Sequence, residues 1–311
     1  MAAVDILAAF GYKWAETGAV EALDDAQYKA GWAFIGATPP SVEQFNKVHQ
    51  IADEKANYLY SQMLSTFNAA GAVPAPGASD TLLNSVTALF GAGRVTGVQG
   101  FYSSGTFTKN PKTNSGIVMI SAGGGGGGAG PITAAGQVGV GSGGGSGTFA
   151  LCYFDALASG PVVIGAGGTG GTPNASNILS AGSAGGASTF GGVSCPGGVA
   201  GLSAGPANPP FNPQGTGQGS PATNGGSAFI LLNAPGGPGG IAIPIGVSAV
   251  AGGVGAPSAF GGGGNTNSGN GPGATALAYG AGGGGGVCGP SSSAGAGGAG
   301  GPGYVVIIEL S

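Results

Sequence analysis

Charge is scarce in this sequence and unevenly placed. All seven Lys and Arg residues of the 311-residue chain lie at or before Lys112, and beyond that position only Asp155 and Glu309 are charged. A net charge of −4 without a basic patch argues against nucleic acid as a partner. Because no window holds 18 strongly apolar residues, no membrane insertion is expected. The first residues also lack the basic start and longer apolar core of a signal peptide.

Cysteine and histidine are equally scarce. Cys152, Cys195 and Cys288 are odd in number and far apart, which favours small buried thiols over a disulfide framework. The single histidine, His49, leaves no Ser-His-Asp set to assemble, and the glycine-rich region holds too few carboxylates to suggest a glycan-cleaving pair. Matches to G-x-G-x-x-G are trivial here, and no glycine run continues into the Lys-Ser/Thr of a phosphate loop. We therefore predict no catalytic residue, no metal site and no cofactor.

Glycine dominates the rest of the chain. Of the 74 glycines, the longest runs fill residues 123–128, 261–264 and 282–286. Each glycine costs roughly 0.5–1 kcal/mol more backbone entropy to order than alanine, so such tracts are usually flexible. This one carries apolar anchors throughout and ends in a strand-like segment, residues 304–310, which a Gly/Ser linker lacks. We expect extended three-residue-per-turn helices whose backbone groups hydrogen-bond laterally.

A long helix is predicted to begin after Ser41, whose hydroxyl can cap it while Gln44 reaches back. Its apolar residues follow a 3-4-4 spacing and form one straight stripe: Phe45, Val48, Ala52, Ala56, Leu59, Met63 and Phe67. Either self-association into a parallel bundle or cover by the N-terminal aromatic residues would bury the stripe. Residues 73–77 indicate a linker, and a second, short helix is expected after Ser79 or Asp80.

These patterns predict an α+β protein in three parts. Residues 1–72 form a helical region, possibly a helix bundle that makes the chain an oligomer, and residues 73–97 form a linker with a short helix. Residues 98–311 form a domain of β-strands and polyglycine-II-type helices. Strand-like segments punctuate this domain, and residues 101–108 and 117–121 flank a turn that indicates a hairpin. The other strand-like segments are residues 148–154, 161–164, 228–232, 241–245 and 304–308.

Connecting loops are what a rigid glycine scaffold would present to a partner. Three of them, residues 172–179, 207–214 and 265–270, are uncharged and rich in Asn and Pro, and their amides and aromatic rings suit adaptable hydrogen bonding and stacking. They can equally be plain solvent-exposed turns. The candidate contact residues are Asn174, Asn177, Asn208, Phe211, Asn212, Gln214, Asn265, Asn267, Asn270 and Tyr279.

Several motifs together resemble bacteriophage or prophage tail fibres of the glycine-rich type. They are residues 104–108, 162–171, 185–192 and 297–309, with residues 31–32, 39–40 and 42–46 in the N-terminal part. The resemblance implies a virion protein at the tail tip, assembled in the host bacterial cytoplasm and commonly a homotrimer. It implies that the N-terminal region attaches to other tail or baseplate proteins. The variable loops would bind a bacterial surface receptor: a glycan, a pilus or an outer-membrane protein.

Two other functions remain open at this stage. A non-catalytic structural fibre or coat protein would have the same composition, but its loops would recognise nothing. An ice-binding bundle of glycine helices fits less well, because the sequence shows no regular triplet face and adds a helical N-terminal region.

Overall fold

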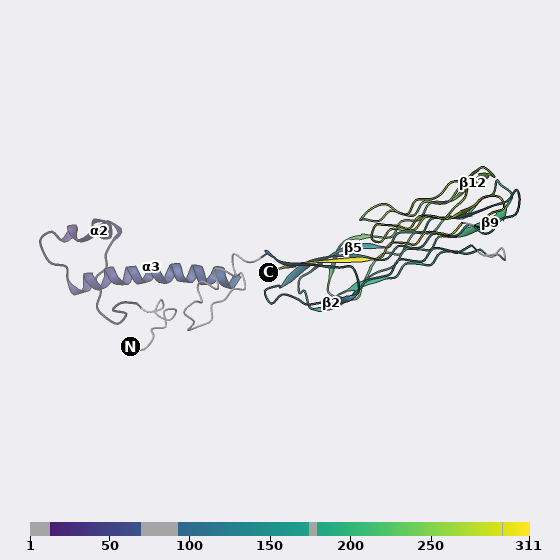
Figure 1. Ribbon diagram of the computed structural model, residues 1–311. Coiled ribbons are helices and arrows are strands. Elements are labelled where there is room, and N and C mark those ends of the chain that lie inside the picture. The colour runs from purple at the N-terminus through teal and green to yellow at the C-terminus, as the bar shows by residue number, and fades with distance from the viewer. Residues whose placement is uncertain (1–12, 70–92, 174–178, 294) are drawn as a thin grey trace. The chain divides into compact units, whose positions relative to one another are not determined.

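The computed structural model describes residues 13–69, 93–173, 179–293 and 295–311 (Figure 1). The chain divides into two compact units, Met1–Gly93 and Arg94–Ser311, which are described separately. The short helix predicted after Ser79 lies outside the described residues, as does the side chain of Phe67. Within the described part of the chain, no helix combines the length and apolar character needed to cross a membrane.

The first unit contains the helices of the structure. Its elements are α2 (Asp25–Ala30), the 3₁₀ helix η1 (Gly31–Ile35) and α3 (Val42–Ala69). The capping box predicted at the start of α3 is confirmed, because the backbone N–H of Gln44 donates to the Ser41 hydroxyl and the backbone N–H of Ser41 donates to the Gln44 side chain, each at 3.1 Å. Asp24 and Gln27 cap α2 in the same way.

Trp14 is held against one side of α3 by two hydrogen bonds. Its indole N–H donates to Asn46 at 3.0 Å, and its backbone N–H donates to the Asp53 carboxylate at 2.6 Å. The Trp14 ring lies 5.4 Å from the ring of His49. Farther along the helix the predicted stripe is open, with Leu59 65% exposed and no partner helix beside it in the described residues.

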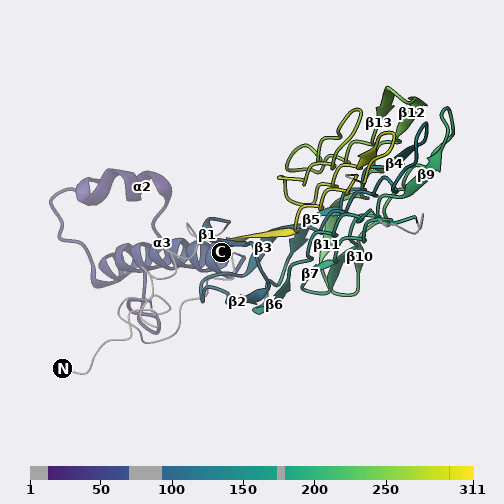
Figure 2. The same cartoon turned by 45° about the vertical axis from the view of Figure 1, so that its right-hand side comes forward.

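The second unit is built from four β-sheets. Sheet A has the strand order β1-β15-β3-β5-β11, and sheet B has the order β10-β8-β7-β6-β2 (Figure 2). The remaining sheets are β14-β4-β9 and β12-β13. The strands are β1 (Val95–Phe101), β2 (Gly105–Phe107), β3 (Ser115–Ser121), β4 (Val138–Gly141), β5 (Phe149–Phe154), β6 (Gly160–Val163), β7 (Ser188–Phe190), β8 (Val193–Cys195), β9 (Ser203–Ala207), β10 (Thr223–Asn224), β11 (Phe229–Ala234), β12 (Ile243–Gly246), β13 (Ala249–Ala251), β14 (Val287–Cys288) and β15 (Tyr304–Leu310).

The α+β class with an N-terminal helix bundle, predicted from the sequence, is therefore wrong. The structure is mainly β, and its described helices form no bundle. The hairpin predicted between residues 101–108 and 117–121 is also wrong. β1 pairs with β15 and β2 pairs with β6, while β3 lies between β15 and β5. These pairings join segments far apart in sequence, which a local turn pattern does not reveal.

Sheets A and B enclose the larger hydrophobic core. Every second residue of β3, β5 and β15 points into it, as the alternating burial of these strands shows. Phe107 and Phe190 are 0% and 2% exposed and meet edge-on at 5.6 Å. The free thiols of Cys152 and Cys195 lie in the same core, as their scarcity in the sequence predicted.

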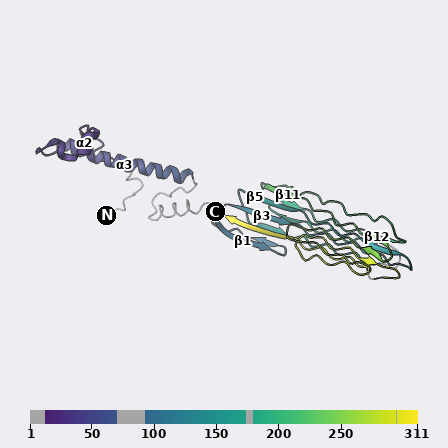
Figure 3. The ribbon, with the colours of Figure 1, turned by 90° about the horizontal axis from the view of Figure 1, so that it is seen from above.

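Beyond the sheets the strands continue into parallel and antiparallel glycine segments (Figure 3). Residues 123–130 form the central segment, and each of its backbone N–H groups donates a hydrogen bond of 2.7–3.0 Å. The acceptors change with a three-residue period. Gly123 and Gly126 donate to residues 186 and 183, Gly124 and Gly127 donate to residues 301 and 298, and Gly125 and Gly128 donate to residues 145 and 142. A three-residue period is that of the extended helix with lateral rather than internal bonds.

The carbonyl groups of the central segment accept from three further neighbours, which contain residues 198–201, 168–171 and 283–286. Six neighbouring segments therefore surround residues 123–128 and leave no space for a side chain. A Cβ added at any of these six glycines would lie 2.0–2.1 Å from a backbone carbonyl oxygen. Neighbouring segments at the surface carry an exposed residue at every third position, such as Ala166, Thr169 and Thr172.

Candidate functional site

Loops from distant parts of the chain meet at the end of the glycine segments that carries β9 and β12 (Figures 1 and 2). We call this end the tip. The tip consists of residues 131–137, 207–214, 246–249, 267–270 and 289–293. Backbone hydrogen bonds join two of its loops, residue 133 to 292 and residue 291 to 134, and the N–H of residue 269 donates to the carbonyl of Val250 in β13, next to the tip.

A polar network ties three of the tip loops together. The Asn270 side-chain oxygen accepts from the Ser292 hydroxyl at 2.5 Å and from the backbone N–H of Gly289 at 3.3 Å. The Thr133 hydroxyl donates to the Gly289 carbonyl and accepts from the Ser292 backbone N–H. Asn270 therefore orders the tip through its side-chain oxygen while the residue itself stays exposed.

A second, smaller hydrophobic core supports the tip loops. It consists of Val138, Val140, Ala242, Val250 and Val287, which come from four separate segments because Val138 and Val140 both lie on β4. The ring of Phe211 packs against this core and is half-buried. The loop of residues 207–214 is therefore anchored by an aromatic side chain, and its polar residues remain free to face outward.

Most of the predicted contact residues gather at the tip. Asn208, Asn212 and Gln214 are exposed on one loop, and Asn267 and Asn270 are exposed on another. Asn265 is exposed on the glycine segment that leads into the second loop, where its backbone carbonyl accepts from the Ala274 N–H. Asn174 and Asn177 lie outside the described residues.

Tyr279 lies apart from the tip, in an aromatic cluster beside sheet A. Its ring stacks on Tyr304 at 4.9 Å, and Tyr102 also lies 4.9 Å from Tyr304. The neutral Tyr304 hydroxyl is stabilised by a hydrogen bond with the Tyr102 side chain, and this bond, together with partial burial, raises the pKa of Tyr304. Phe260 meets Tyr304 edge-on at 5.8 Å. The structure thus separates Tyr279 from the asparagine-rich loops.

Thr133 and Ser292 were missed at the sequence level. Both lie where the glycine pattern is interrupted, at residues 131–137 and 289–293, so the breaks in the glycine runs were the available signal. These loops contain no asparagine, so asparagine content did not indicate them as contact loops.

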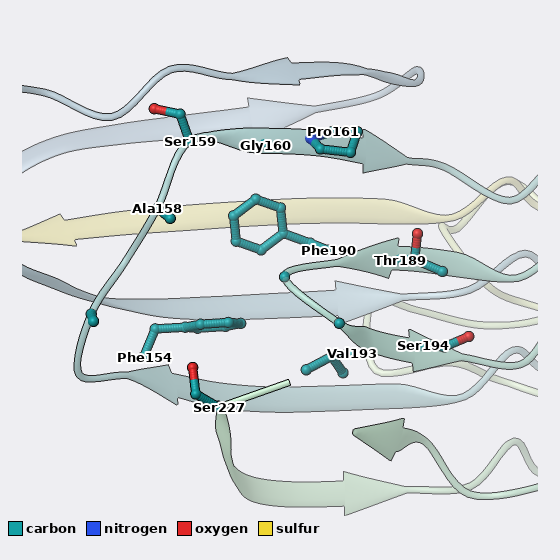
Figure 4. A pocket seen from close by; sticks show the side chains of 13 residues that line it. Phe154, Ala158, Ser159, Gly160, Pro161, Thr189, Phe190, Val193, Ser194 and Ser227 are labelled. Carbon is teal, nitrogen blue, oxygen red and sulfur yellow. The ribbon is translucent and has the colours of Figure 1, made fainter. Parts of the chain in front are cut away.

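A hollow of about 450 Å³ opens at the opposite end of the unit, between the β5–β6 connection and the β7–β8 turn. Figure 4 shows the Phe190 ring between Phe154 and the strand that carries Gly160 and Pro161. Hydroxyl groups of Thr189, Ser194 and Ser227 are also part of the lining. The lining is uncharged and mixes aromatic with hydroxyl groups.

The chemistry of the tip is that of neutral hydrogen bonding. No residue of the tip loops is charged. Among the residues that the structure describes, no group of three or more His, Cys, Asp and Glu side chains is placed to hold a metal ion. Amide, hydroxyl and backbone groups on a fixed frame can recognise a polar partner by hydrogen-bond geometry.

Residues 102–308 match a protein family described as a glycine-rich domain. The chain belongs to this glycine-rich domain family. The matched range begins just after β1 and ends within β15, so it takes in sheet B, the other strands of sheet A, the glycine segments and the tip. A comparison with curated proteins found no match.

Proposed function

We propose that this protein is a bacteriophage tail-fibre protein that attaches the virion to a bacterial surface through its tip. One observation carries the proposal: several uncharged loops, distant in sequence, are tied together by side-chain hydrogen bonds at the end of a glycine bundle. The motif resemblance to glycine-rich tail fibres points in the same direction. The receptor would be a neutral polar structure, a glycan or an uncharged protein surface such as a pilus or outer-membrane protein.

Rigidity is what makes the glycine bundle suitable for this task. Binding costs free energy for every side chain and loop that it orders, and a preorganised surface has already met that cost. The central segment has no freedom to rearrange, because all of its N–H groups are bonded and its Cα atoms touch neighbouring carbonyl groups. The Phe211 anchor and the Asn270 network extend this order into the loops.

The first unit supports attachment to other tail proteins. None of the described side chains of residues 13–65 is buried, and Tyr58 and Leu59 are 63% and 65% exposed. A helix normally gains its stability by packing an apolar face. We infer that α3 packs against another component of the virion.

Adsorption of the purified full chain to host cells tests the proposal. We expect simultaneous replacement of Asn208, Asn212 and Gln214 by Ser to lower cell binding at least about tenfold, which corresponds to about 1.4 kcal/mol. The matched control is Thr223→Ala, an exposed residue of sheet B on a different part of the unit, which should bind as the unaltered chain does.

The outcome separates two classes of protein. Host-specific binding that the tip replacements abolish supports the attachment function. Equal binding by both variants, or binding without host preference, would instead indicate a structural glycine-rich fibre or coat protein.

A further inference from the structure

The side chain of Asn270 is fixed in one orientation at the tip. Its oxygen, Oδ1, accepts from the Ser292 hydroxyl at 2.5 Å and from the backbone N–H of Gly289 at 3.3 Å. A backbone N–H can only donate, so the atom that faces it has to be the amide oxygen and not the amide nitrogen. The Gly289 contact therefore excludes the flipped amide, and Ser292 adds a second bond to the same oxygen.

The nitrogen of the Asn270 amide is left for a partner outside the chain. Within the described part of the chain, both hydrogen bonds of this side chain use its oxygen, and the residue is exposed. An amide NH₂ group carries two N–H donors. The side chains of Asn212 and Gln214, by contrast, form no hydrogen bond with another described residue, so either end of their amides can face a partner. Asn270 alone among these three presents a donor of fixed direction.

We propose that Asn270 is a specificity-determining residue of the tip, which donates through its NH₂ group to an oxygen of a neutral glycan on the host surface. The inference rests on the attachment function proposed above and names the receptor class for the same site. A donor that is fixed before binding favours affinity, because its side chain has little rotamer freedom left to lose. Hydroxyl and ring oxygens of a sugar are uncharged acceptors, and the tip loops carry no charge that would favour an ionic receptor.

The composition of the tip loops favours a glycan over a protein surface. Interfaces between proteins depend mainly on a few anchors, among which Trp, Tyr and Arg are enriched. The tip loops contain none of these three residue types. Their one aromatic residue, Phe211, is half-buried against the smaller core. Recognition at the tip therefore depends on amide, hydroxyl and backbone groups, which match the hydroxyl groups of a sugar.

Two substitutions of Asn270 in the full chain test the donor role, with adsorption to host cells as the measurement. Asn270→Asp keeps an oxygen for Ser292 and Gly289 but replaces the NH₂ group by a second oxygen. Its thermal unfolding midpoint should not fall, whereas cell binding should drop about tenfold or more. Asn270→Ser removes the NH₂ group without adding a charge and should lower binding about threefold to tenfold. The control is Asn114→Asp, the same change at an exposed residue outside the tip, which should bind as the unaltered chain does.

The two variants separate the loss of a donor from the gain of a charge. Unchanged binding by Asn270→Ser overturns the donor role, because a loss in Asn270→Asp alone would then come from its charge. Unchanged binding by a folded Asn270→Asp also overturns it, and Asn270→Ser decides the question if Asn270→Asp does not fold. The attachment function fails under other results: no adsorption of the unaltered chain, or unchanged adsorption when Asn208, Asn212 and Gln214 are replaced together.

Treatment of the host cells tests the receptor class with the unaltered chain. Periodate cleaves the vicinal diols of sugars, so we expect oxidised cells to lose binding. Protease digestion of the cell surface should leave binding unchanged. Loss after both treatments would indicate a glycan attached to a protein and would agree with the proposal. Loss after protease digestion alone would identify a protein receptor, and binding that survives periodate would overturn the glycan assignment.

Discussion

The carboxylate of Glu309 accepts a 2.7 Å hydrogen bond from the backbone N–H of Asn110, 199 positions earlier in the chain. The Thr113 hydroxyl donates to the same oxygen at 2.8 Å, and the Gln99 side chain donates to the other oxygen at 3.1 Å. Burial favours the neutral acid, but these donors and the nearby Lys109 charge outweigh it and lower the pKa of Glu309 below its ordinary value. The buried carboxylate thereby links β15 by hydrogen bonds to β1 and to the loop before β3.

We expect the stability of the second unit to depend on the ionisation of Glu309. Because the folded pKa is lowered, the contribution is complete above the ordinary value of 4.5 and is lost as the pH falls through the folded pKa. In Glu309→Gln the new side-chain NH₂ group would face the donors that now bond to the carboxylate. We expect this to lower the free energy of unfolding by about 1–3 kcal/mol at neutral pH. Thermal unfolding from pH 7 downward measures both effects, and the acid-dependent loss should be smaller in Glu309→Gln.

A control, Asp155→Asn at an exposed acid, should change stability by no more than about 0.5 kcal/mol. A variant as stable as the unaltered chain at pH 7 would contradict this account.

Alanine at Gly126 should destabilise the glycine bundle. The added Cβ would lie 2.0 Å from the carbonyl oxygen and 2.4 Å from the carbonyl carbon of Thr169, and both belong to the backbone, which cannot move aside cheaply. We expect Gly126→Ala to cost about 3 kcal/mol or more in unfolding free energy. Gly217→Ala is the matched control, because a Cβ there meets nothing within 4 Å. Equal unfolding midpoints for the two variants would show that the glycine segments are not packed closely enough around Gly126 to exclude a methyl group.

The core thiols should resist modification while the protein is folded. Burial raises the pKa of Cys152 to about 11, and burial, together with the proximity of Cys152, raises the pKa of Cys195 to about 12. The thiolate is the reactive form, so at pH 8 we expect both cysteines to react with a thiol reagent only after unfolding. Mass spectrometry after timed labelling measures this. Rapid native-state labelling of Cys195 would argue against a closed core between sheets A and B.

Removing the Phe211 ring should loosen the tip without unfolding sheet A. The ring is half-buried against the smaller core, so we expect Phe211→Ala to cost about 2 kcal/mol, below the range for fully buried rings. Amide exchange should accelerate in β4 and β13 and stay unchanged in β3. The neighbouring exposed residue provides the control, Asn212→Ala, for which exchange should not change. Uniform acceleration across the unit would show that the tip and the sheets unfold together.

Local features of the fold were predictable from the sequence. The Ser41 and Gln44 spacing predicted the start of α3, and apolar runs predicted β5, β6, β11 and β15 close to their observed positions. Capping and strand propensity depend on neighbouring residues, so a single sequence contains them. The gathering of asparagine-rich loops at one end was not predictable, because it depends on the direction in which each glycine segment runs.

The pairing of strands that are distant in the sequence could not be predicted from the sequence pattern. The hairpin expected around residues 109–116 assumed that adjacent strands pair, whereas β3 pairs with β15 and β5. The α+β assignment with a possible bundle is wrong for a related reason: the period of residues 42–67 predicts an apolar stripe, but only tertiary contacts decide whether another helix covers it. Tyr279 was grouped with the loops because of its side chain, but ring contacts with Tyr102 and Tyr304 hold it beside sheet A.

The sequence by itself determined where charge is absent, where the chain extends and where glycine leaves room for close approach of backbones. The tertiary structure decided which six segments surround residues 123–128, which loops form the tip and which face of sheet A packs on the larger core. Glycine explains this division. A residue without a side chain permits every neighbour equally, so the choice of neighbour rests on hydrogen bonds between backbone groups that look alike in the sequence.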